Sequence, residues 1–467
     1  MIRIILFGAG GFLKDRCDKL SDMDDVKIVG ISDNNNAIYG ETILGFIIRP
    51  IYDIKEDYDY IVIASTYEAE IENTLLKMGV KQNTIIRWRQ FENIVNKKKY
   101  RKILECKKNP KVRSILALTP VLEYNGAFLA LVYILMYMIR TYGFNVTIVS
   151  PEERDDIKDV FGGRGINLIL CPDLLFNATT FDWNKEYDFF IVNTLLMHRC
   201  LRNLHCNNTI WWLHESPSYY LSEIKRWDDF SDDVYSHFRT MCVSEESREV
   251  FETFFPNSKT EIFTYGLPDF YAGEEIFNRD RVVIAVIGAL LERKGQDIFL
   301  DAVEDIDSKC RSFCEFWIIG KAYGDEFGDS VCKRAKEIGV KFLGDVSHNE
   351  LELLFREIDI IVSSSRHDPL PICITEGMMN SKLCIIPDCI GNAKYVKHEE
   401  SALIYQSGNA KELAQMISYA LKNKTEMCEI AKRGRIIYRN YFSEECAGER
   451  MNSIIREMCC EKTKCHL

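Results

Sequence analysis

The chain has 467 residues, of which 47% are hydrophobic and 28% charged, and its formal net charge is −11. At roughly 100 to 200 residues a domain, this length allows about three compact units, and the hydrophobic fraction excludes global disorder. Nucleic acid is excluded as an expected partner, because phosphate backbones are bound by concentrated basic surfaces and this chain is acidic overall.

The first unit is expected over residues 1–95. The start MIRIILFGAGG has the pattern of a first β-strand rather than of a cleavable signal, and strand-like and helix-like runs then alternate up to a helix through EAEIENTLLKMG. Alternation of this kind predicts a small parallel α/β domain of Rossmann type.

A glycine-rich turn follows the first strand of this unit. Gly8, Gly10 and Gly11 lie in the turn, and Asp33 follows the second strand at roughly the spacing that a Rossmann site uses for a ribose. Leu13 stands where a third glycine is expected. Two hypotheses remain, namely a domain that binds NAD or another nucleotide and a structural domain without nucleotide. The unit resembles the small Rossmann domains attached to bacterial sugar-processing enzymes.

Residues 96–113 are expected to form a basic linker. Between Lys97 and Arg113 there are nine Lys or Arg residues and one Glu. One interpretation is a solvated linker helix, and the other is a patch in residues 97–113 that contacts anionic lipid at the inner face of a membrane.

A second α/β unit is expected over residues 114–270, where strand-like runs such as SILALTPV and NVTIVS alternate with helical stretches. The longest apolar stretch, residues 127–139, is shorter than the ~20 residues of a membrane-spanning helix and predicts a buried core helix, so we expect a cytoplasmic protein. Asn125 and Gly126 precede this stretch and form either a simple turn or a close approach of the backbone to a ligand.

A third α/β unit is expected over residues 271–440, with strand-like runs from RVVIAVIGALL to LCIIPD, followed by a C-terminal helix and tail over residues 441–467. Cysteines and a histidine gather in the tail, where they are either incidental or a metal site. These residues are Cys459, Cys460, Cys465 and His466.

Two acids in the third unit carry the clearest chemical signal. In VSSSRHDPLPICITEG a strand ends at the serines, and Asp368 and Glu376 then lie on either side of a proline-rich turn that contains Pro371. A helix start presents free N–H groups and a positive dipole end to a phosphate or a polar sugar, and acids accept hydrogen bonds from hydroxyls. On these residues alone, helix capping is an equal alternative.

The order of motifs from residue 114 to about 458 resembles the retaining GT-B glycosyltransferases of family four, whose signature is an acid, seven residues and then a Glu. The fold implied is two Rossmann-like domains, here preceded by the small N-terminal one. The resemblance implies that Asp368, where the family more often has Glu, contacts the donor sugar. It also implies that Glu376 holds the ribose hydroxyls and that Pro371 belongs to the donor-binding turn.

The same resemblance implies roles for residues before this signature. IGALLERKGQDIFLDA is similar to the segment that holds the donor diphosphate, with Gly288 in its turn and with Lys294 and Arg293 as cations that offset charge on the leaving group. The family often has Arg where this chain has Ala289, so Lys294 and Arg293 would share that task. IWWLHESP is similar to the strand end that places a histidine, here His214, near the reacting sugar.

Gly126 matches the family's glycine loop near the donor phosphates. Taken without the resemblance, Arg293 and Lys294 are solvated cations at a helix start, and His214 is a structural residue at a strand end. These interpretations stay open at this point.

The function implied is a glycosyltransferase of hexosyltransferase type, which moves a sugar from a nucleotide-sugar donor to a glycan or lipid-linked acceptor with retention of anomeric configuration. His214, Asp368 and Lys294 would be its catalytic residues. Polysaccharide or glycoconjugate biosynthesis is the expected pathway, and no metal or other cofactor is expected for the transfer. Two alternatives are a bifunctional protein with an NAD-dependent sugar-modifying N-terminal domain, and a regulator that binds a nucleotide sugar without catalysis.

Overall fold

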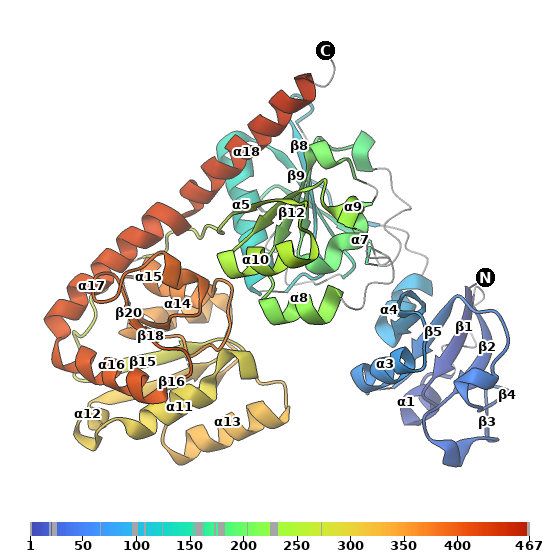
Figure 1. The fold of residues 1–467 in the computed structure, drawn as a ribbon, viewed down its shortest axis with the longest axis horizontal. Coiled ribbons are helices and arrows are strands. Elements are labelled where there is room, and N and C mark those ends of the chain that lie inside the picture. The colour runs from blue at the N-terminus through green and yellow to red at the C-terminus, as the bar shows by residue number, and fades with distance from the viewer. Residues whose placement is uncertain are drawn as a thin grey trace.

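The computed structural model describes residues 2–464 except 18–19, 21–25, 66, 96–100, 107–108, 124, 153, 155–160, 162, 172–173, 176–182, 203, 225–231 and 272. Three α/β units follow one another along the chain, each around its own sheet. Figure 1 shows the first unit, in blue, to one side of the other two. The α/β fold class expected from the sequence is therefore confirmed.

The first unit has a four-stranded sheet of order β2-β1-β5-β6, in which every neighbouring pair is parallel. Its strands are β1 (Ile2–Phe7), β2 (Val26–Ser32), β5 (Tyr60–Ile63) and β6 (Ile85–Arg87), and its described helices include α1 (Gly11–Lys14), α3 (Glu68–Lys77) and α4 (Trp88–Val95). Ile4, Ile5 and Leu6 in β1 are all fully buried. Burial of consecutive residues is what a central parallel strand covered on both faces requires.

The second unit has an eight-stranded sheet of order β14-β13-β12-β11-β8-β9-β10-β7. Its strands are β7 (Arg101–Leu104), β8 (Ser114–Leu118), β9 (Asn145–Ser150), β10 (Ile166–Leu170), β11 (Phe189–Asn193), β12 (Thr209–Leu213), β13 (Arg239–Cys242) and β14 (Lys259–Ile262). All of its pairs are parallel except that of β7 with β10.

The structure differs from the expected linker helix within residues 96–113. Residues 101–104 form strand β7, which extends the second sheet beyond β10 in antiparallel direction. The physical reason is that β10 would otherwise present an unpaired edge, which a strand arriving from the first unit covers. The rest of the proposed lipid-binding patch lies partly outside the described residues.

The apolar stretch at residues 127–139 lies in helix α5 (Gly126–Tyr142), most of which is buried against the second sheet. Asn125 caps its start by accepting a hydrogen bond from the backbone of Phe128 at 3.0 Å, and Gly143 ends it in a left-handed conformation. The prediction of a buried core helix is confirmed. Within the described part of the chain, no helix combines the length and apolarity needed to cross a membrane.

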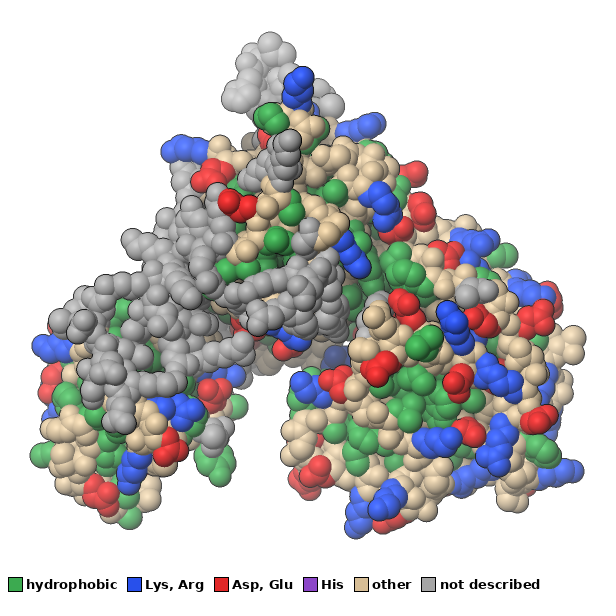
Figure 2. Space-filling model, turned by 180° about the vertical axis from the view of Figure 1, so that it is seen from behind, with side chains coloured by type: hydrophobic (Ala, Val, Ile, Leu, Met, Phe, Trp, Pro, Cys, Tyr) green, Lys and Arg blue, Asp and Glu red, His purple; other side chains and the backbone are tan. Residues whose placement is uncertain are grey.

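The third unit has a six-stranded parallel sheet of order β17-β16-β15-β18-β19-β20. Its strands are β15 (Val282–Ile287), β16 (Cys314–Ile319), β17 (Lys341–Gly344), β18 (Ile360–Val362), β19 (Leu383–Pro387) and β20 (Leu403–Tyr405), and its helices include α11 (Gln296–Asp305), α13 (Glu326–Glu337), α14 (His348–Glu357), α15 (Ile372–Met379), α16 (Ala410–Lys422) and α17 (Lys424–Ile437). Figure 2 shows cationic and acidic side chains interspersed over the described surface of this unit, without a broad basic field on that face.

Strand order defines one crevice in each of the two larger units. The chain winds outward from β8 through β9 and β10, and then returns to β11 on the other side of β8. In the third unit it winds from β15 through β16 and β17, and returns to β18. Loops that leave the carboxyl ends of strands at such a reversal diverge and open a ligand-binding crevice. The fold therefore places candidate sites after β8 and β11 and after β15 and β18.

The two larger units are joined by two chain segments that contact each other. Leu267 donates a backbone hydrogen bond to Phe442 at 2.8 Å and accepts one from Glu444 at 3.0 Å. Gly266 is packed so closely that a Cβ there would lie 2.5 Å from the carbonyl oxygen of Ser443. Both crossings of the chain are thus fixed to one another.

After the second crossing, helix α18 (Glu444–Lys464) runs back along the second unit and packs on α5 (Figure 1). Gly448 allows this packing, because a Cβ there would lie 2.0 Å from the ring of Tyr137. Ion pairs fasten the helix at both ends, with Arg140 to Glu444 at 2.6 Å and Arg239 to Glu457 at 3.0 Å. The C-terminal helix therefore completes the second unit.

Replacing Gly448 with Ala should loosen this contact. Overpacking of a tight core contact costs about 1 to 3 kcal/mol, which the better helix propensity of Ala offsets only in part, so the thermal unfolding midpoint should fall. The control is Gly163→Ala, because a Cβ at Gly163, which lies in a turn, meets no atom of the described residues within 4 Å. Differential scanning calorimetry compares the two variants, and an equal midpoint for both would contradict the packing described.

Candidate functional site

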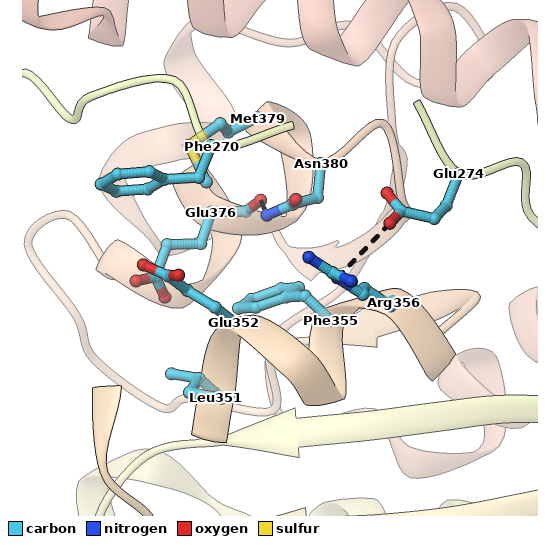
Figure 3. Close-up of a pocket in the computed structure, with 9 residues that line it drawn as sticks. All are labelled: Phe270, Glu274, Leu351, Glu352, Phe355, Arg356, Glu376, Met379 and Asn380. Carbon is cyan, nitrogen blue, oxygen red and sulfur yellow. Dashed lines mark hydrogen bonds and ion pairs between the residues drawn. The ribbon is translucent and has the colours of Figure 1, made fainter. Parts of the chain in front are cut away.

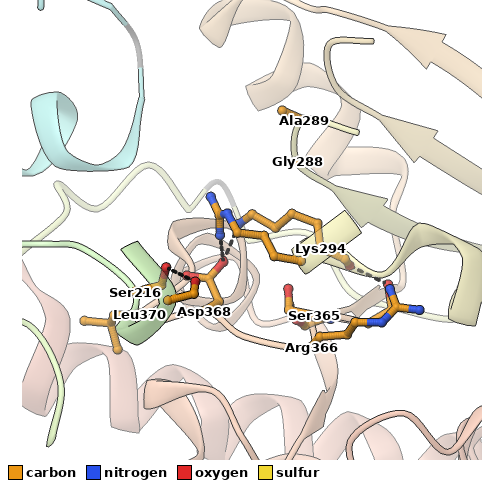
Figure 4. A network of polar contacts seen from close by, with 12 residues as sticks. Ser216, Gly288, Ala289, Lys294, Ser365, Arg366, Asp368 and Leu370 are labelled. Carbon is orange, nitrogen blue, oxygen red and sulfur yellow. Dashed lines mark hydrogen bonds and ion pairs between the residues drawn. The ribbon is translucent and has the colours of Figure 1, made fainter. Parts of the chain in front are cut away.

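Two cations and an acid meet at the crevice of the third unit. Lys294 and Arg293 come from the loop after β15, and Asp368 comes from the loop after β18. The Lys294 ammonium forms an ion pair with the Asp368 carboxylate, and Arg293 Nη1 lies 3.6 Å from the same oxygen (Figure 4). Asp368 is only 8% exposed, and a carboxylate buried to that extent requires paired cations.

The two loops are held together by their backbones. Gly295 has a φ of +64°, and a Cβ there would lie 2.1 Å from the carbonyl oxygen of Ser364, so only glycine fits. The backbone N–H of Arg366 donates to the carbonyl of Arg293 at 2.8 Å. The guanidinium of Arg366 donates two hydrogen bonds to the carboxylate of Asp297, at 2.8 and 2.6 Å. These contacts position the cations before any ligand binds.

Gly288 directly follows β15 and has a φ of +148°, a conformation that favours glycine. A Cβ there would lie 3.8 Å from the side chain of Lys294, so the turn passes beside that side chain. The turn is fixed, because the N–H of Gly288 donates to the carbonyl of Ile319 at 2.8 Å and its carbonyl accepts from Gln296 at 3.3 Å.

Glu376 lies in α15, which begins directly after Pro371. It lines a small pocket of about 40 Å³ between α14, α15 and the segment that enters the third unit. The other lining residues are Phe270, Glu274, Leu351, Glu352, Phe355, Arg356, Met379 and Asn380. Figure 3 shows the carboxyl groups of Glu376 and Glu352 near each other on one side of this pocket. Carboxyl oxygens at the edge of such a pocket can accept hydrogen bonds from the hydroxyl groups of a ligand.

The pKa of Glu376 is raised from 4.5 to about 7, first because burial disfavours the charged carboxylate and second because Glu352 is close. A ligand that donates hydrogen bonds to the carboxylate would favour its ionised form. Sequence reasoning missed Glu352, since only the packing of α14 beside α15 brings the two acids together.

His214 follows β12 of the second unit, with its ring against Trp212 at 4.5 Å between centroids. Burial lowers its pKa to about 3, so the ring is neutral at physiological pH. Its Nε2 is buried and has no hydrogen-bond partner among the described residues. A buried nitrogen of this kind is suited to a hydroxyl of a bound ligand.

The two units touch at the starts of two helices. A Cβ at Gly126, the first residue of α5, would lie 3.5 Å from Ile372, the first residue of α15. Tyr265 of the second unit donates a hydrogen bond to the carbonyl of Leu370 at 3.0 Å. The structure therefore brings Gly126 beside the helix start that follows Asp368.

A second crevice opens in the second unit after β8, β11 and β12, as the strand order predicts. Asn193 ends β11, and Thr194 follows it with a φ of +79°. Glu215 accepts hydrogen bonds from the backbone N–H groups of Leu195 at 2.7 Å and His214 at 2.9 Å. Burial raises the pKa of Glu215 to about 7. Sequence reasoning singled out His214 in this crevice but not Asn193, Thr194 or Glu215. Of these three, only Glu215 has a local signal, because it is an acid at the end of a strand.

The glycine-rich turn of the first unit is organised by Asp33. Its carboxylate accepts from the backbone N–H of Ala9 at 2.6 Å and from that of Asn35 at 2.8 Å. Gly8 has a φ of +108°, and a Cβ there would lie 2.7 Å from the carbonyl oxygen of Ala64. Asp33 thus stabilises the turn itself, a role that the sequence did not suggest.

Gly10 and Gly11 face open space among the described residues, since a Cβ on either would meet none of their atoms within 4 Å. The possible metal site in the C-terminal tail is the remaining prediction from the sequence. Two of its residues, Cys465 and His466, lie outside the described residues. Elsewhere, the described residues contain no cluster of three or more His, Cys, Asp or Glu arranged to hold a metal.

Two family models match parts of this chain. Residues 270–437 match the model described as "Glycosyl transferases group 1", and residues 1–86 match the one described as "C2185-like, N-terminal". The first match covers the third unit, with Lys294, Asp368 and Glu376, and the second covers the N-terminal unit.

Two curated relatives are each 25% identical to this chain. One is an uncharacterised glycosyltransferase of Methanocaldococcus jannaschii, aligned over 34% of this chain and 44% of its own length. The other is the lipopolysaccharide core biosynthesis glycosyltransferase LpsE of Rhizobium meliloti, aligned over 36% of this chain and 47% of its own. The chain thus spans about half the length of the curated relatives it matches.

Solved structures match a larger part of the fold. Anabaena HepE in complex with UDP-glucose aligns with a TM-score of 0.61 and 16% identity, over 74% of this chain and all of that one. The lipopolysaccharide biosynthesis glycosyltransferase WaaG aligns with a TM-score of 0.55 and 14% identity, over 72% and 98%. The GT-B fold is therefore confirmed.

The raised pKa of Glu376 predicts a pH-dependent stability. A carboxyl that keeps its proton longer in the folded state stabilises the fold fully below about pH 4.5, and this stabilisation, about 3 kcal/mol, is lost as the pH rises through about 7. Glu376→Gln, which stays neutral, should therefore be more stable relative to wild type at pH 8 than at pH 5. Thermal unfolding of both proteins at the two pH values measures this.

The control for this experiment is Glu337→Gln, on the exposed side of α13. The difference in thermal unfolding midpoint between Glu337→Gln and wild type should be the same at pH 5 and pH 8. If Glu376→Gln also showed no change between the two pH values, the burial argument for Glu376 would be wrong.

Proposed function

We propose that this chain is a retaining glycosyltransferase of hexosyltransferase type, which binds a nucleotide sugar at the crevice of the third unit and transfers its glycosyl group to a glycan or lipid-linked acceptor. The observation that carries this proposal is the contact of Lys294 and Arg293 with Asp368 at the reversal of strand order. Loop cations at such a crevice suit a diphosphate, and Glu376, on the helix that follows Asp368, can accept hydrogen bonds from ribose hydroxyls.

Each group has a distinct task in this proposal. Lys294 and Arg293 leave Asp368 in part to bind the donor diphosphate, and Asp368 then accepts hydrogen bonds from the sugar hydroxyls. Glu376 accepts from the ribose hydroxyls, and His214, which is neutral, hydrogen bonds the sugar. These charges act most strongly on the diphosphate as the bond to the sugar breaks, because negative charge grows there.

The transfer needs no nucleophile from the protein. The acceptor hydroxyl oxygen forms a bond to the anomeric carbon on the face from which the diphosphate departs, and the bond from that carbon to the diphosphate oxygen breaks. The hydroxyl proton passes to the departing oxygen. This route retains the configuration, and the two loop cations stand where the leaving group needs neutralisation, so we propose that no metal is required.

The setting of the reaction is part of the proposal. A cytoplasmic protein, peripheral at the inner face of the membrane, that builds polysaccharide or glycoconjugate would meet both nucleotide sugars and lipid-linked acceptors. The relative LpsE, whose name assigns it to lipopolysaccharide core biosynthesis, supports this setting.

The N-terminal unit remains a candidate for NAD or another nucleotide. The open space over Gly10 and Gly11 supports close approach of a ligand, whereas Asp33 is already engaged by Ala9 and Asn35. Ribose hydroxyls at this position would have to share the Asp33 carboxylate with the N–H groups of Ala9 and Asn35. Titration of the full chain with NADH and with UDP tests both candidates, and Asp33→Asn should weaken any binding that uses this turn.

Donor binding is tested by isothermal titration with UDP-glucose and with GDP- and ADP-linked sugars. We expect one donor to bind, and Glu376→Ala to weaken it by about tenfold or more, because hydrogen bonds to a charged partner are lost. Glu337→Ala is the control. Equal affinity of Glu376→Ala and wild type would remove Glu376 from the donor site.

Lys294→Met should distinguish the contribution of the diphosphate to donor affinity from that of the nucleoside. It should weaken binding of UDP strongly and that of uridine little, because only UDP places charge at the loop cations. Lys336→Met, on the exposed surface of α13, controls for the general loss of a positive charge. If Lys294→Met weakened the binding of uridine as much as that of UDP, Lys294 would not act on the diphosphate. Release of free nucleotide from the bound donor then distinguishes an enzyme from a non-catalytic binding protein.

A further inference from the structure

The crevice of the second unit holds a pocket of about 270 Å³. It lies among the loops that leave β8, β11 and β12, at the reversal of strand order. Its described lining residues are Thr119, Pro120, Val121, Glu123, Asn125, Ala127, Phe128, Asn193, Thr194, Leu196, Glu215 and Tyr219.

Two polar atoms in this lining are buried without a partner. Asn193 and Thr194 are 0% and 8% exposed, and neither Asn193 Oδ1 nor Thr194 Oγ1 has a hydrogen-bond partner among the described residues. Asn193 uses its amide nitrogen to donate to the carbonyl of Ala127 at 3.3 Å, which turns its oxygen away from that contact. Buried polar atoms are normally satisfied, so these two are suited to a ligand.

Thr194 also has a strained backbone. Its φ of +79° is unfavourable for a β-branched residue, yet three contacts hold it. Its N–H donates to the carbonyl of Trp212 at 2.8 Å, its own carbonyl accepts from Trp211 Nε1 at 2.9 Å, and the next N–H donates to Glu215 at 2.7 Å. A fold that fixes a strained residue beside a pocket holds that side chain in one position.

The charge of the pocket restricts what it binds. Its described lining contains two acids, Glu123 and Glu215, and no Lys, Arg or His. A phosphate or carboxylate would meet these acids without a compensating cation. Val121, Phe128 and Leu196 supply apolar walls. Unpaired hydroxyl and carbonyl groups beside apolar walls match a neutral sugar, which has hydroxyls at its edge and C–H groups on its faces.

The pocket adjoins the donor crevice. Asn125 and Ala127 of its lining flank Gly126, which contacts Ile372 at the start of α15. Glu215 is also tied to the segment after β13, because its carbonyl accepts from Ser247 at 2.7 Å. A sugar in this pocket would therefore lie on the side of the second unit that faces the third.

We propose that this pocket binds the terminal sugar of the acceptor and that this sugar is neutral, with Asn193 Oδ1 accepting from one hydroxyl and Thr194 Oγ1 contacting another. The inference rests on the proposed function and makes it narrower. A glycan ending in an uncharged sugar is accepted, whereas an acceptor whose terminal sugar is a uronate or carries a phosphate is not. Glu215 acts as a positioning residue, because it fixes Leu195 and thereby Thr194.

The first test uses the full chain without substitution. Saturation-transfer NMR measures binding of methyl glycosides of glucose, galactose, mannose and N-acetylglucosamine, and of methyl glucuronide and glucose 1-phosphate, with UDP present to occupy the donor site. At least one neutral glycoside should bind more tightly than both anionic compounds, by about tenfold or more. Tighter binding of either anionic compound, or no binding of any neutral glycoside, overturns the inference.

The second test uses Thr194→Val, which keeps the side-chain shape and removes the hydroxyl. The KM for the neutral acceptor should rise by about tenfold, while the Kd of the donor by calorimetry stays within about twofold. Thr194→Ser should restore most of the acceptor affinity. Thr253→Val, on the exposed side of α10 (Glu245–Phe254), is the control.

The two levels of the proposal fail differently. Loss of donor binding in wild type would refute the proposed function itself. Donor binding with an acceptor KM unchanged in Thr194→Val would refute only the assignment of this pocket. If Thr194→Val does not fold, the NMR comparison on the unchanged chain still decides the inference.

Discussion

The contact between the two chain crossings at Leu267 and Ser443 is the constraint on which the rest of the arrangement depends. Hydrogen bonds of Leu267 to both neighbours of Ser443 fix the second and third units at one point, and one apolar cluster continues through α5, α18 and α15. Each unit alone has a crevice at its reversal of strand order. Because the crossings hold the units together, Gly126, beside the crevice of the second unit, lies next to Ile372 at the start of α15.

The two crevices differ in charge, and this difference underlies the ligands proposed for them. The third unit gathers the cations Lys294 and Arg293 around one buried carboxylate, that of Asp368, so positive charge is in excess at its crevice. The second unit has acids and unpaired neutral groups at Asn193 and Thr194. A molecule with a charged and an uncharged end would bind in only one orientation across the junction, and electrostatics alone would select it.

The sequence predicted what depends on residue type and order. The alternation of strands and helices gave the α/β units, and motif order placed Lys294 and Asp368 in one site, which their direct contact agrees with. Strand β7 was missed because a basic segment becomes a strand only if a neighbouring sheet has an open edge. The φ of Thr194 was missed because threonine gives no local signal for it. The bond from Asp33 to the first turn depends on packing between two loops, which no spacing encodes.

Helix α18 has a consequence for how such a chain can be rearranged in evolution or by design. It follows the third unit in sequence, yet Gly448, Glu444 and Glu457 complete the second unit through their contacts with Tyr137, Arg140 and Arg239. A single cut between the two units would leave the N-terminal part without its covering helix. Recombination that exchanges donor specificity between relatives therefore needs two breakpoints, one near each crossing, so that the third unit travels as an insertion and α18 stays with the unit it covers.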